Sequence, residues 1–437
     1  MVDENKKNFY INRNIKLMPS YIALTWDVIF IWTISTMFFS TEKGLDYSQI
    51  IALDSILMLI GCVICIPINK FFEKIPSSTA SRLGTLGYAA YILLCIFGTS
   101  YYVFVIAQVF LAFAYTVNSV KVNKILTESL SVVNRNKDYE RVYGKGLFLY
   151  YVLEAVGAIL ITYVYSWNHY AGYWASLGVV VLAEVISIFI TDAKKFQQSN
   201  IKLKAEVVSK NDEKKSSSYF KILKSGFFVC LLIYICVMRG TLSIVGSGFK
   251  VYLQQLTEDF KVLPIWLFGY IYAGIKITSA ISSKYQFKFN LKFGVRSIVI
   301  FTFFSIVTFI INGVIYLINP SSIVSIILIV ISTYIQGAMY APIRIFANNY
   351  MQVCMHPKDM DKSYSIRVSV EYFGYATISA LYAMLLSIYS DNVGLTNLVF
   401  IGILILPIVI SMVLFIKFLI KKHAQKYTII NDEYVND

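Results

Sequence analysis

Five charged side chains stand inside long apolar stretches, where a charge is costly unless it meets a partner or water. Glu154 is the one carboxylate of FLYYVLEAVGAIL, residues 148–160, and Asp27 lies in LTWDVIFIW. Glu371 stands in RVSVEYFGY, Arg239 in CVMRGTLSIVGSG and Lys276 in YAGIKITSA. Acids and bases at such depth can bind a charged ligand, exchange a proton or ion, or pair with one another.

Glu154 and Asp27 each admit a functional and a structural interpretation. Both lie well inside their apolar stretches, at a depth where ionisable groups mark a path for ions or ligands. The structural alternative is a hydrogen bond that ties two neighbouring helices together. Tyr150 and Tyr151 precede Glu154 by one helical turn, so they either line the same site or pack in the core.

The basic members of the set lie in the second half of the chain. Arg239 and Lys276 each occupy the middle of an apolar stretch, whereas Glu371 stands four residues after Arg367. An i,i+4 ion pair would satisfy Glu371 and Arg367 locally. With Asp27 and Glu154 in the first half and the bases in the second, we expect attraction across a shared polar cavity. The cations then either form internal ion pairs or bind an anionic ligand, and both readings stay open.

The composition indicates the elements that carry these residues. Apolar residues make up 57% of the 437 and charged ones 15%, and the mean hydropathy is +0.64, which is typical of membrane proteins. A spanning helix needs about 20 apolar residues. The sequence predicts an all-α protein with twelve such helices, with one broken helix as the alternative at GTSYY and at INPSS. The predicted spans are 17–39, 47–69, 80–99, 101–123, 145–167, 171–191, 223–252, 263–283, 296–317, 322–343, 364–388 and 396–420.

The distribution of basic residues predicts the orientation of these spans. If the N-terminus is cytoplasmic, the outer loops hold only three cations, Lys43, Lys250 and Lys261, and two more, Arg239 and Lys276, lie within spans. The other 34 of the 39 Lys and Arg residues then face the cytoplasm. Because cytoplasmic loops of membrane proteins carry the excess of positive charge, we expect both termini in the cytoplasm.

We therefore expect a multi-pass protein of the cell membrane. The first apolar run is too long for the core of a cleavable signal, so the first helix should be retained. The net charge of +14 then reflects orientation and contact with anionic lipids of the bilayer. Nucleic acid is not an expected partner.

The chain divides into two similar halves. Residues 191–221 are rich in Lys and end in a serine run, which indicates a flexible cytoplasmic linker between an N-terminal bundle, 1–190, and a C-terminal bundle, 222–437. KDYERVYGKG, residues 137–146, precedes the fifth span, and KDMDKSYSIR, residues 358–367, precedes the eleventh. Their shared Lys, Asp and Tyr at corresponding places predict a parallel repeat of six helices each.

Twelve spans, two parallel halves, cytoplasmic termini and a central basic loop together resemble the major facilitator superfamily of secondary transporters. NKFFEKIPSS, residues 69–78, is similar to the family's loop G-x-L-A-D-R-x-G-R-K through Glu73 and Lys74. TESLSVVNRNKDYERVYGKG, residues 127–146, resembles the loop before the fifth helix of many members. The resemblance implies a monomer that moves a small molecule by alternating access, with protons as a candidate coupling ion.

The resemblance also implies where residues act. Substrate and coupling ion would meet near the membrane midplane between the halves. Glu73 and Lys74, with Arg82 just beyond, would hold the halves together on the cytoplasmic side as a gate. The expected substrate and ion site comprises Asp27, Tyr150, Tyr151, Glu154, Arg239, Lys276 and Glu371. Gln108 stands where an arginine is expected, and Ala158 follows Gly157 where proton antiporters carry Gly-Pro, which counts against drug–proton antiport.

Other functions have less support in the residues. The three histidines lie in loops, and the chain lacks H-E-x-x-H and G-x-x-x-x-G-K-[ST] motifs, so neither an enzyme, a cofactor nor use of ATP is expected. Cys62 and Cys65 form a C-x-x-C without a second pair or a nearby histidine, which favours packing over a metal site. A lipid flippase of the same fold and a non-transporting membrane sensor are the alternatives that remain.

Overall fold

A computed structural model describes residues 4–45, 47–165, 167–192, 222–223, 226–258, 265–294, 296–318, 321–354, 360–389 and 393–422 of the chain. These residues form α-helices with short connections, and no β-strand occurs among them. Two 3₁₀ turns, η1 (Phe72–Lys74) and η2 (Asn136–Asp138), precede α4 and α6. The helices are α1 (Glu4–Thr25), α2 (Ile31–Thr41), α3 (Tyr47–Phe71), α4 (Ser77–Phe97), α5 (Tyr101–Val132), α6 (Tyr139–Tyr165), α7 (Ala171–Ile188), α10 (Gly226–Glu258), α11 (Ile265–Phe293), α12 (Arg296–Ile318), α13 (Ile323–Cys354), α14 (Met360–Ile388) and α15 (Val393–Lys422).

The prediction of an all-α, multi-pass membrane protein is confirmed. Within the described residues, eight helices are long and apolar enough to cross a membrane. Within the described residues each predicted span overlaps a helix, but the count of twelve is not exact because the first span comprises α2 and the end of α1. At GTSYY and INPSS the chain forms two separate helices, so the broken-helix alternative is wrong at both places.

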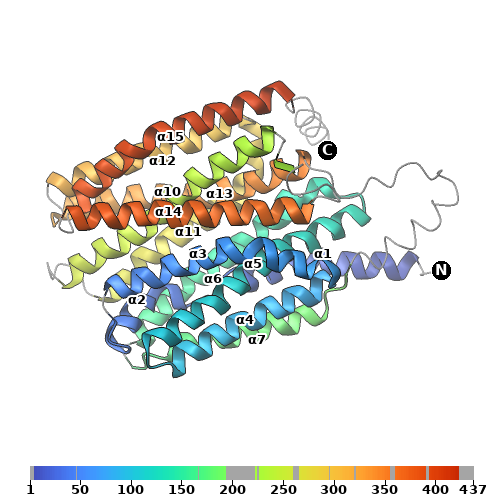
Figure 1. Ribbon diagram of the computed structural model, residues 1–437, viewed down its shortest axis with the longest axis horizontal. Coiled ribbons are helices and arrows are strands. Elements are labelled where there is room, and N and C mark those ends of the chain that lie inside the picture. Colours follow the sequence, from blue (N-terminus) through green and yellow to red (C-terminus); the bar gives the residue numbers. More distant parts are fainter. Residues whose placement is uncertain are drawn as a thin grey trace.

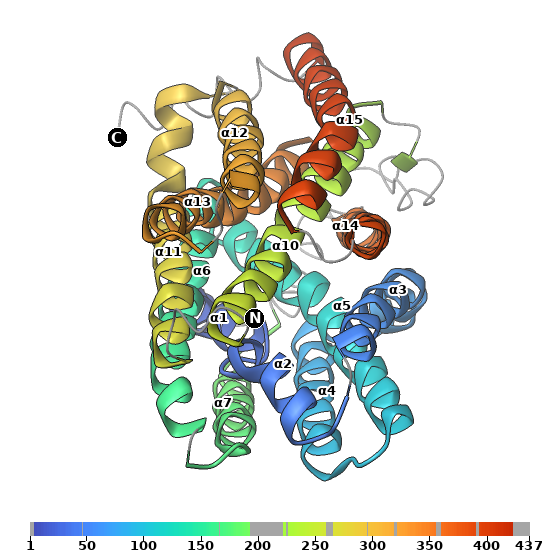
Figure 2. The ribbon, with the colours of Figure 1, turned by 90° about the vertical axis from the view of Figure 1, so that its left-hand side faces the viewer.

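The helices run side by side along the long axis of the molecule (Figure 1). α1 begins and α15 ends at the same end of the molecule, which we call the terminal end. Seen along the helices in Figure 2, α1–α7 lie together below and α10–α15 lie together above, here called the first and second groups. The predicted linker, 191–221, lies almost entirely outside the described residues, so the domain boundaries stay a proposal.

Two seams join the groups. α6 packs against α11, and α3 packs against α14 on the other flank (Figure 2). Gly144 of α6 lies so close to α11 that a β-carbon there would be 2.8 Å from the carbonyl oxygen of Ser283. Small residues allow such close approach of membrane helices, which associate through packing and hydrogen bonds rather than a hydrophobic force.

The first predicted span is interrupted between α1 and α2. Residues 26–30 leave the helical path, and Phe30 has φ of 75°, in the left-handed region that non-glycine residues rarely adopt. The Phe30 ring occupies the space above Gly157 of α6, where a β-carbon would lie 2.1 Å from its Cδ1. Asp27 stands inside the interruption, so its carboxylate meets the backbone that the break exposes.

Candidate functional site

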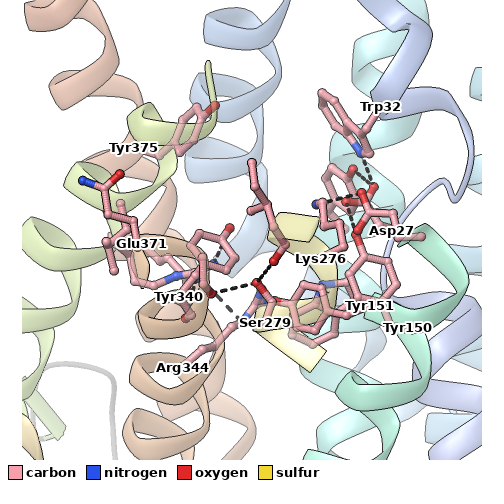
Figure 3. A pocket seen from close by; sticks show the side chains of 18 of the residues that line it. Asp27, Trp32, Tyr150, Tyr151, Lys276, Ser279, Tyr340, Arg344, Glu371 and Tyr375 are labelled. Carbon is pink, nitrogen blue, oxygen red and sulfur yellow. Dashed lines mark hydrogen bonds and ion pairs between the residues drawn. The ribbon is translucent and has the colours of Figure 1, made fainter. Parts of the chain in front are cut away.

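A cavity of about 260 Å³ lies between the two groups of helices (Figure 3). Side chains from both groups line it, and all seven predicted substrate and ion residues are among them. Asp27, Tyr150, Tyr151 and Glu154 come from the first group, and Arg239, Lys276 and Glu371 come from the second. Figure 3 shows Asp27, Tyr150 and Tyr151 on one side of the cavity and Glu371, Tyr340 and Arg344 on the other.

The Asp27 carboxylate is held by a ring of donors at the helix break. The Val28 backbone N–H donates to Oδ1 at 2.7 Å, and the Trp32 indole Nε1–H donates to the same oxygen at 2.6 Å. The Tyr115 hydroxyl also donates to Oδ1, and the Tyr150 hydroxyl donates to Oδ2 at 3.4 Å. Asp27 therefore anchors the start of α2, and it also lines the cavity.

Glu154 and Lys276 form an ion pair across the seam between α6 and α11. The Lys276 Nζ lies 2.8 Å from Glu154 Oε1, and the two side chains are 16% and 3% exposed. The ammonium also lies 4.9 Å from the centre of the Tyr272 ring. The expected attraction between an acid of one half and a base of the other is confirmed for this pair.

Glu371 lies among three arginines of the second group. Arg239 Nε donates to Oε1 at 2.8 Å and Arg367 Nη1 donates to Oε2 at 2.8 Å, while Arg344 Nε lies 3.9 Å from Oε1. The i,i+4 contact with Arg367 was expected. Arg239 was expected to face the acids of the first half, and instead its recorded carboxylate partner is Glu371 in its own group.

The positions of Arg344 and Arg367 correct the sequence analysis. Both were counted among the cytoplasmic loop cations, as was Lys121, yet they lie in α13, α14 and α5. Arg367 and Lys121 are 0% and 1% exposed. The predicted span 322–343 stops one residue before Arg344, whereas Arg367 and Lys121 stand near the ends of the predicted spans 364–388 and 101–123 and were counted with the adjoining loops. The remaining basic residues keep the same asymmetry.

Two aromatic rings lie against guanidinium groups in the cavity wall. The Arg344 guanidinium lies 4.0 Å from the centre of the Trp26 ring, and the Arg239 guanidinium lies 3.9 Å from that of Tyr340. The contact of Trp26 with Arg344 joins the break between α1 and α2 of the first group to α13 of the second. Sequence analysis assigned no role to Arg344 or Tyr340.

The three predicted gate residues are not brought together across the groups by any contact among the described residues. Glu73 and Lys74 form the end of η1, where Lys74 is exposed. Arg82 Nη2 donates to the carbonyl oxygen of Ser187 at 2.7 Å, a contact inside the first group. The gating role of these residues stays a prediction.

A different acid joins the groups near the terminal end. Glu140, at the start of α6, accepts a hydrogen bond from Asn290 Nδ2 of α11 at 2.7 Å and from Asn349 Nδ2 of α13 at 3.2 Å. Only 6% of Glu140 is exposed. On the other flank, Cys65 Sγ donates to the Ser365 carbonyl oxygen at 3.4 Å. These contacts join the two groups between the cavity and the terminal end.

Within the described residues, no group of three or more His, Cys, Asp or Glu side chains is placed to hold a metal ion. The cavity instead combines paired charges with aromatic walls. Such a site can recognise a small molecule through ion pairs, hydrogen bonds and stacking.

Comparison with known proteins agrees with this architecture. The sequence matches the Major Facilitator Superfamily over residues 17–377. No curated protein matches the sequence. Among solved structures, the fold is similar to that of the nucleoside transporter NupG, with a TM-score of 0.62 and 13% identity over 93% of this chain and 99% of that chain. It is also similar to a bacterial homologue of the iron transporter ferroportin in an outward-facing state, with a TM-score of 0.66 and 12% identity over 94% of this chain and 99% of the other. At these identities the likeness concerns the fold alone.

Proposed function

The chain belongs to the major facilitator superfamily and is a membrane transporter, and we propose that it carries a small molecule across the membrane by alternating access. In this mechanism two helical domains rock about a central site, which opens to one side of the membrane at a time. The family points to transport rather than catalysis. The two domains would be the first and second groups of helices, joined by residues 191–221.

The observation that carries the proposal is the ion pair between Glu154 and Lys276 inside a cavity lined by both groups. A charge pair that crosses the seam must change its surroundings when the groups move. Breaking a buried pair by removal of one partner is strongly unfavourable, by about 3–5 kcal/mol. A substrate or ion that replaces one partner would lower that cost, and its binding would then be coupled to the movement.

The contacts near the terminal end support a state closed toward the cytoplasm. Glu140 and Cys65 join the two groups there, between the cavity and the terminal end. By the positive-inside rule the terminal end faces the cytoplasm, so both termini are cytoplasmic in this proposal. Transport would require the Glu140 contacts to open, and we propose that they act as the cytoplasmic gate together with the predicted Glu73, Lys74 and Arg82.

Proton coupling is a further part of the proposal. Glu154 is the carboxylate best placed to carry the coupling proton, because protonation would release Lys276 from the pair. Asp27 is the competing carrier, but its carboxylate already receives four hydrogen bonds that tie it to the helix break. We therefore assign the proton to Glu154 and a positioning role to Asp27.

A two-stage experiment tests the transport proposal. A thermal-shift screen of the purified protein against metabolites, drugs, sugars and lipids identifies a ligand, since one present at 100 times its Kd stabilises the folded state by about 2.7 kcal/mol. The labelled ligand is then offered to proteoliposomes preloaded with the unlabelled compound. Alternating access predicts counterflow of label into these vesicles and none into vesicles without protein.

Two results would contradict the proposal. A response to lipids alone would favour a flippase of the same fold. A soluble ligand that binds but shows no counterflow would favour a membrane sensor.

A further inference from the structure

The second group of helices carries more positive than negative charge around Glu371. Three guanidinium groups, those of Arg239, Arg344 and Arg367, have this one carboxylate as their recorded ion-pair partner among the described residues. Arg367 is 0% exposed and the Arg344 side chain 13%. Excess charge of one sign inside a membrane protein is expensive unless an ion of opposite sign neutralises it.

Arg344 is the member that can meet an anion in the cavity. It lines the cavity, whereas Arg367 does not. The Arg344 Nε has no hydrogen-bond partner in the described part of the chain, and its distance of 3.9 Å from Glu371 Oε1 is too long for one. Trp26 covers a face of the guanidinium and the Nε is itself buried, so a ligand in the cavity would meet the two Nη groups at the tip of the side chain.

We propose that Arg344 binds a carboxylate group of the transported substrate, an inference that rests on the proposed transport function. The planar fork of a guanidinium matches the two oxygens of a carboxylate. Among the described residues, Arg344 lines the cavity with no hydrogen bond to the protein, whereas Arg239 is hydrogen-bonded and Arg367 lies outside the cavity lining. A single cation suits a singly charged group better than a phosphate. The substrate is thus a small organic acid.

The surrounding side chains indicate where the rest of the acid lies. Trp26 and Tyr340 flank the guanidinium groups, and Tyr150 and Tyr151 face them from the first group (Figure 3). Aromatic walls favour an apolar or aromatic body, which stacks on the rings while the carboxylate meets Arg344. Because Trp26 and Arg344 belong to different groups, an acid bound there contacts both sides of the seam.

The test uses thermal unfolding of the purified full chain at constant pH and ionic strength. The ligands are sodium butyrate, benzoate and phenylacetate, their uncharged amides, and inorganic phosphate. The variants are Arg344→Gln and Arg344→Lys, with Arg135→Gln as the control because Arg135 is exposed and pairs only locally with Asp138. Each protein is melted without ligand and across a titration of each compound.

We expect at least one carboxylate to raise the melting temperature of the unmodified protein while its amide does not. Arg344→Gln should melt at a higher temperature than the unmodified protein without ligand, because it removes an uncompensated charge. Its apparent affinity for the carboxylate should fall by about tenfold or more, the value of a hydrogen bond to a charged group. Arg344→Lys should also lose affinity because it lacks the planar fork, and Arg135→Gln should behave as the unmodified protein.

Several outcomes would overturn the inference: equal effects of acid and amide, a response to phosphate alone, no response to any carboxylate, or an unchanged response in Arg344→Gln. A lower melting temperature of ligand-free Arg344→Gln would make Arg344 a structural link between the groups, and would also overturn it. Counterflow separates this failure from that of the transport proposal. If an uncharged compound shows counterflow, the transport proposal is supported and the carboxylate site at Arg344 is contradicted. If a carboxylate binds at Arg344 but shows no counterflow, the binding site is supported and the transport proposal is contradicted.

Discussion

At the scale of single residues, the proposed mechanism depends on charged side chains that have ion-pair partners in some conformations and not in others. The type and depth of a residue were enough to predict that seven side chains would face one cavity. Their partners could not be predicted, because pairing depends on which helices are neighbours. Glu371 shows this most clearly: the local contact with Arg367 follows from spacing, whereas those with Arg239 and Arg344 join three separate helices.

The role of Glu154 as proton carrier predicts a separation of binding from coupling. In proteoliposomes, Glu154→Gln should retain ligand binding and counterflow but lose accumulation of substrate driven by a pH gradient. Asp27→Asn should weaken the helix break and lower binding without selectively removing the pH-driven component. Normal accumulation by Glu154→Gln would make Glu154 a structural acid.

The pair itself predicts a pattern of stability. Lys276→Met leaves Glu154 buried without its cation, so the free energy of unfolding should fall by about 3–5 kcal/mol. Adding Glu154→Gln to Lys276→Met should restore most of that loss. Lys288→Met, at an exposed position of the same helix, is the matched control and should change stability by about 0.5 kcal/mol or less. Thermal or denaturant unfolding in detergent measures the unmodified protein, the single variants Lys276→Met and Glu154→Gln, the double variant and the control, and additive effects of the two substitutions would argue against the pair.

At the scale of elements, the interrupted first span is the feature that the sequence pattern did not predict. Hydropathy reports that residues 17–39 can lie in a membrane, but it carries no information on backbone dihedral angles. The break depends on tertiary contacts, namely the donors around Asp27 and the space that Gly157 leaves for Phe30. Arg344 was missed for a related reason, because α13 continues past Pro342 to Cys354.

The break predicts a specific sensitivity at Gly157. A β-carbon there would overlap the Phe30 ring, so Gly157→Ala should destabilise the protein by about 1–3 kcal/mol. Gly178→Ala in α7 is the matched control, since nothing lies within 4 Å of its β-carbon position. That substitution should be neutral or should stabilise by about 0.5–1 kcal/mol. The melting temperatures of the two variants test this prediction. Equal values would contradict it, because they would mean that the Phe30 ring moves aside without loss of stability.

At the scale of the whole molecule, the proposed orientation can be tested on intact cells. Tyr102 lies in the first turn of α5 at the end opposite the terminal end, and Phe71 is the last residue of α3 at the terminal end. Both side chains are exposed. With native cysteines replaced, a membrane-impermeant thiol reagent should label Tyr102→Cys and spare Phe71→Cys until the cells are opened. The reverse order of labelling would place the termini outside.

The central claim is that the two groups rock about the cavity, so that closing one end opens the other. Removing the Glu140 carboxylate should release the contacts to Asn290 and Asn349 and shift the population toward a state open at the terminal end. Asp138→Ala is the control, because Asp138 pairs with Arg135 inside the first group, close to Glu140 in the chain.

Pulsed electron paramagnetic resonance in proteoliposomes measures this movement most directly. Spin labels at Phe71 and Lys292 report on the terminal end, and labels at Tyr102 and Ile388 report on the opposite end. In Glu140→Ala, alternating access predicts a longer distance in the first pair and a shorter one in the second, with no change in Asp138→Ala. Unchanged distances in both pairs, or a change at the terminal end alone, would contradict the account.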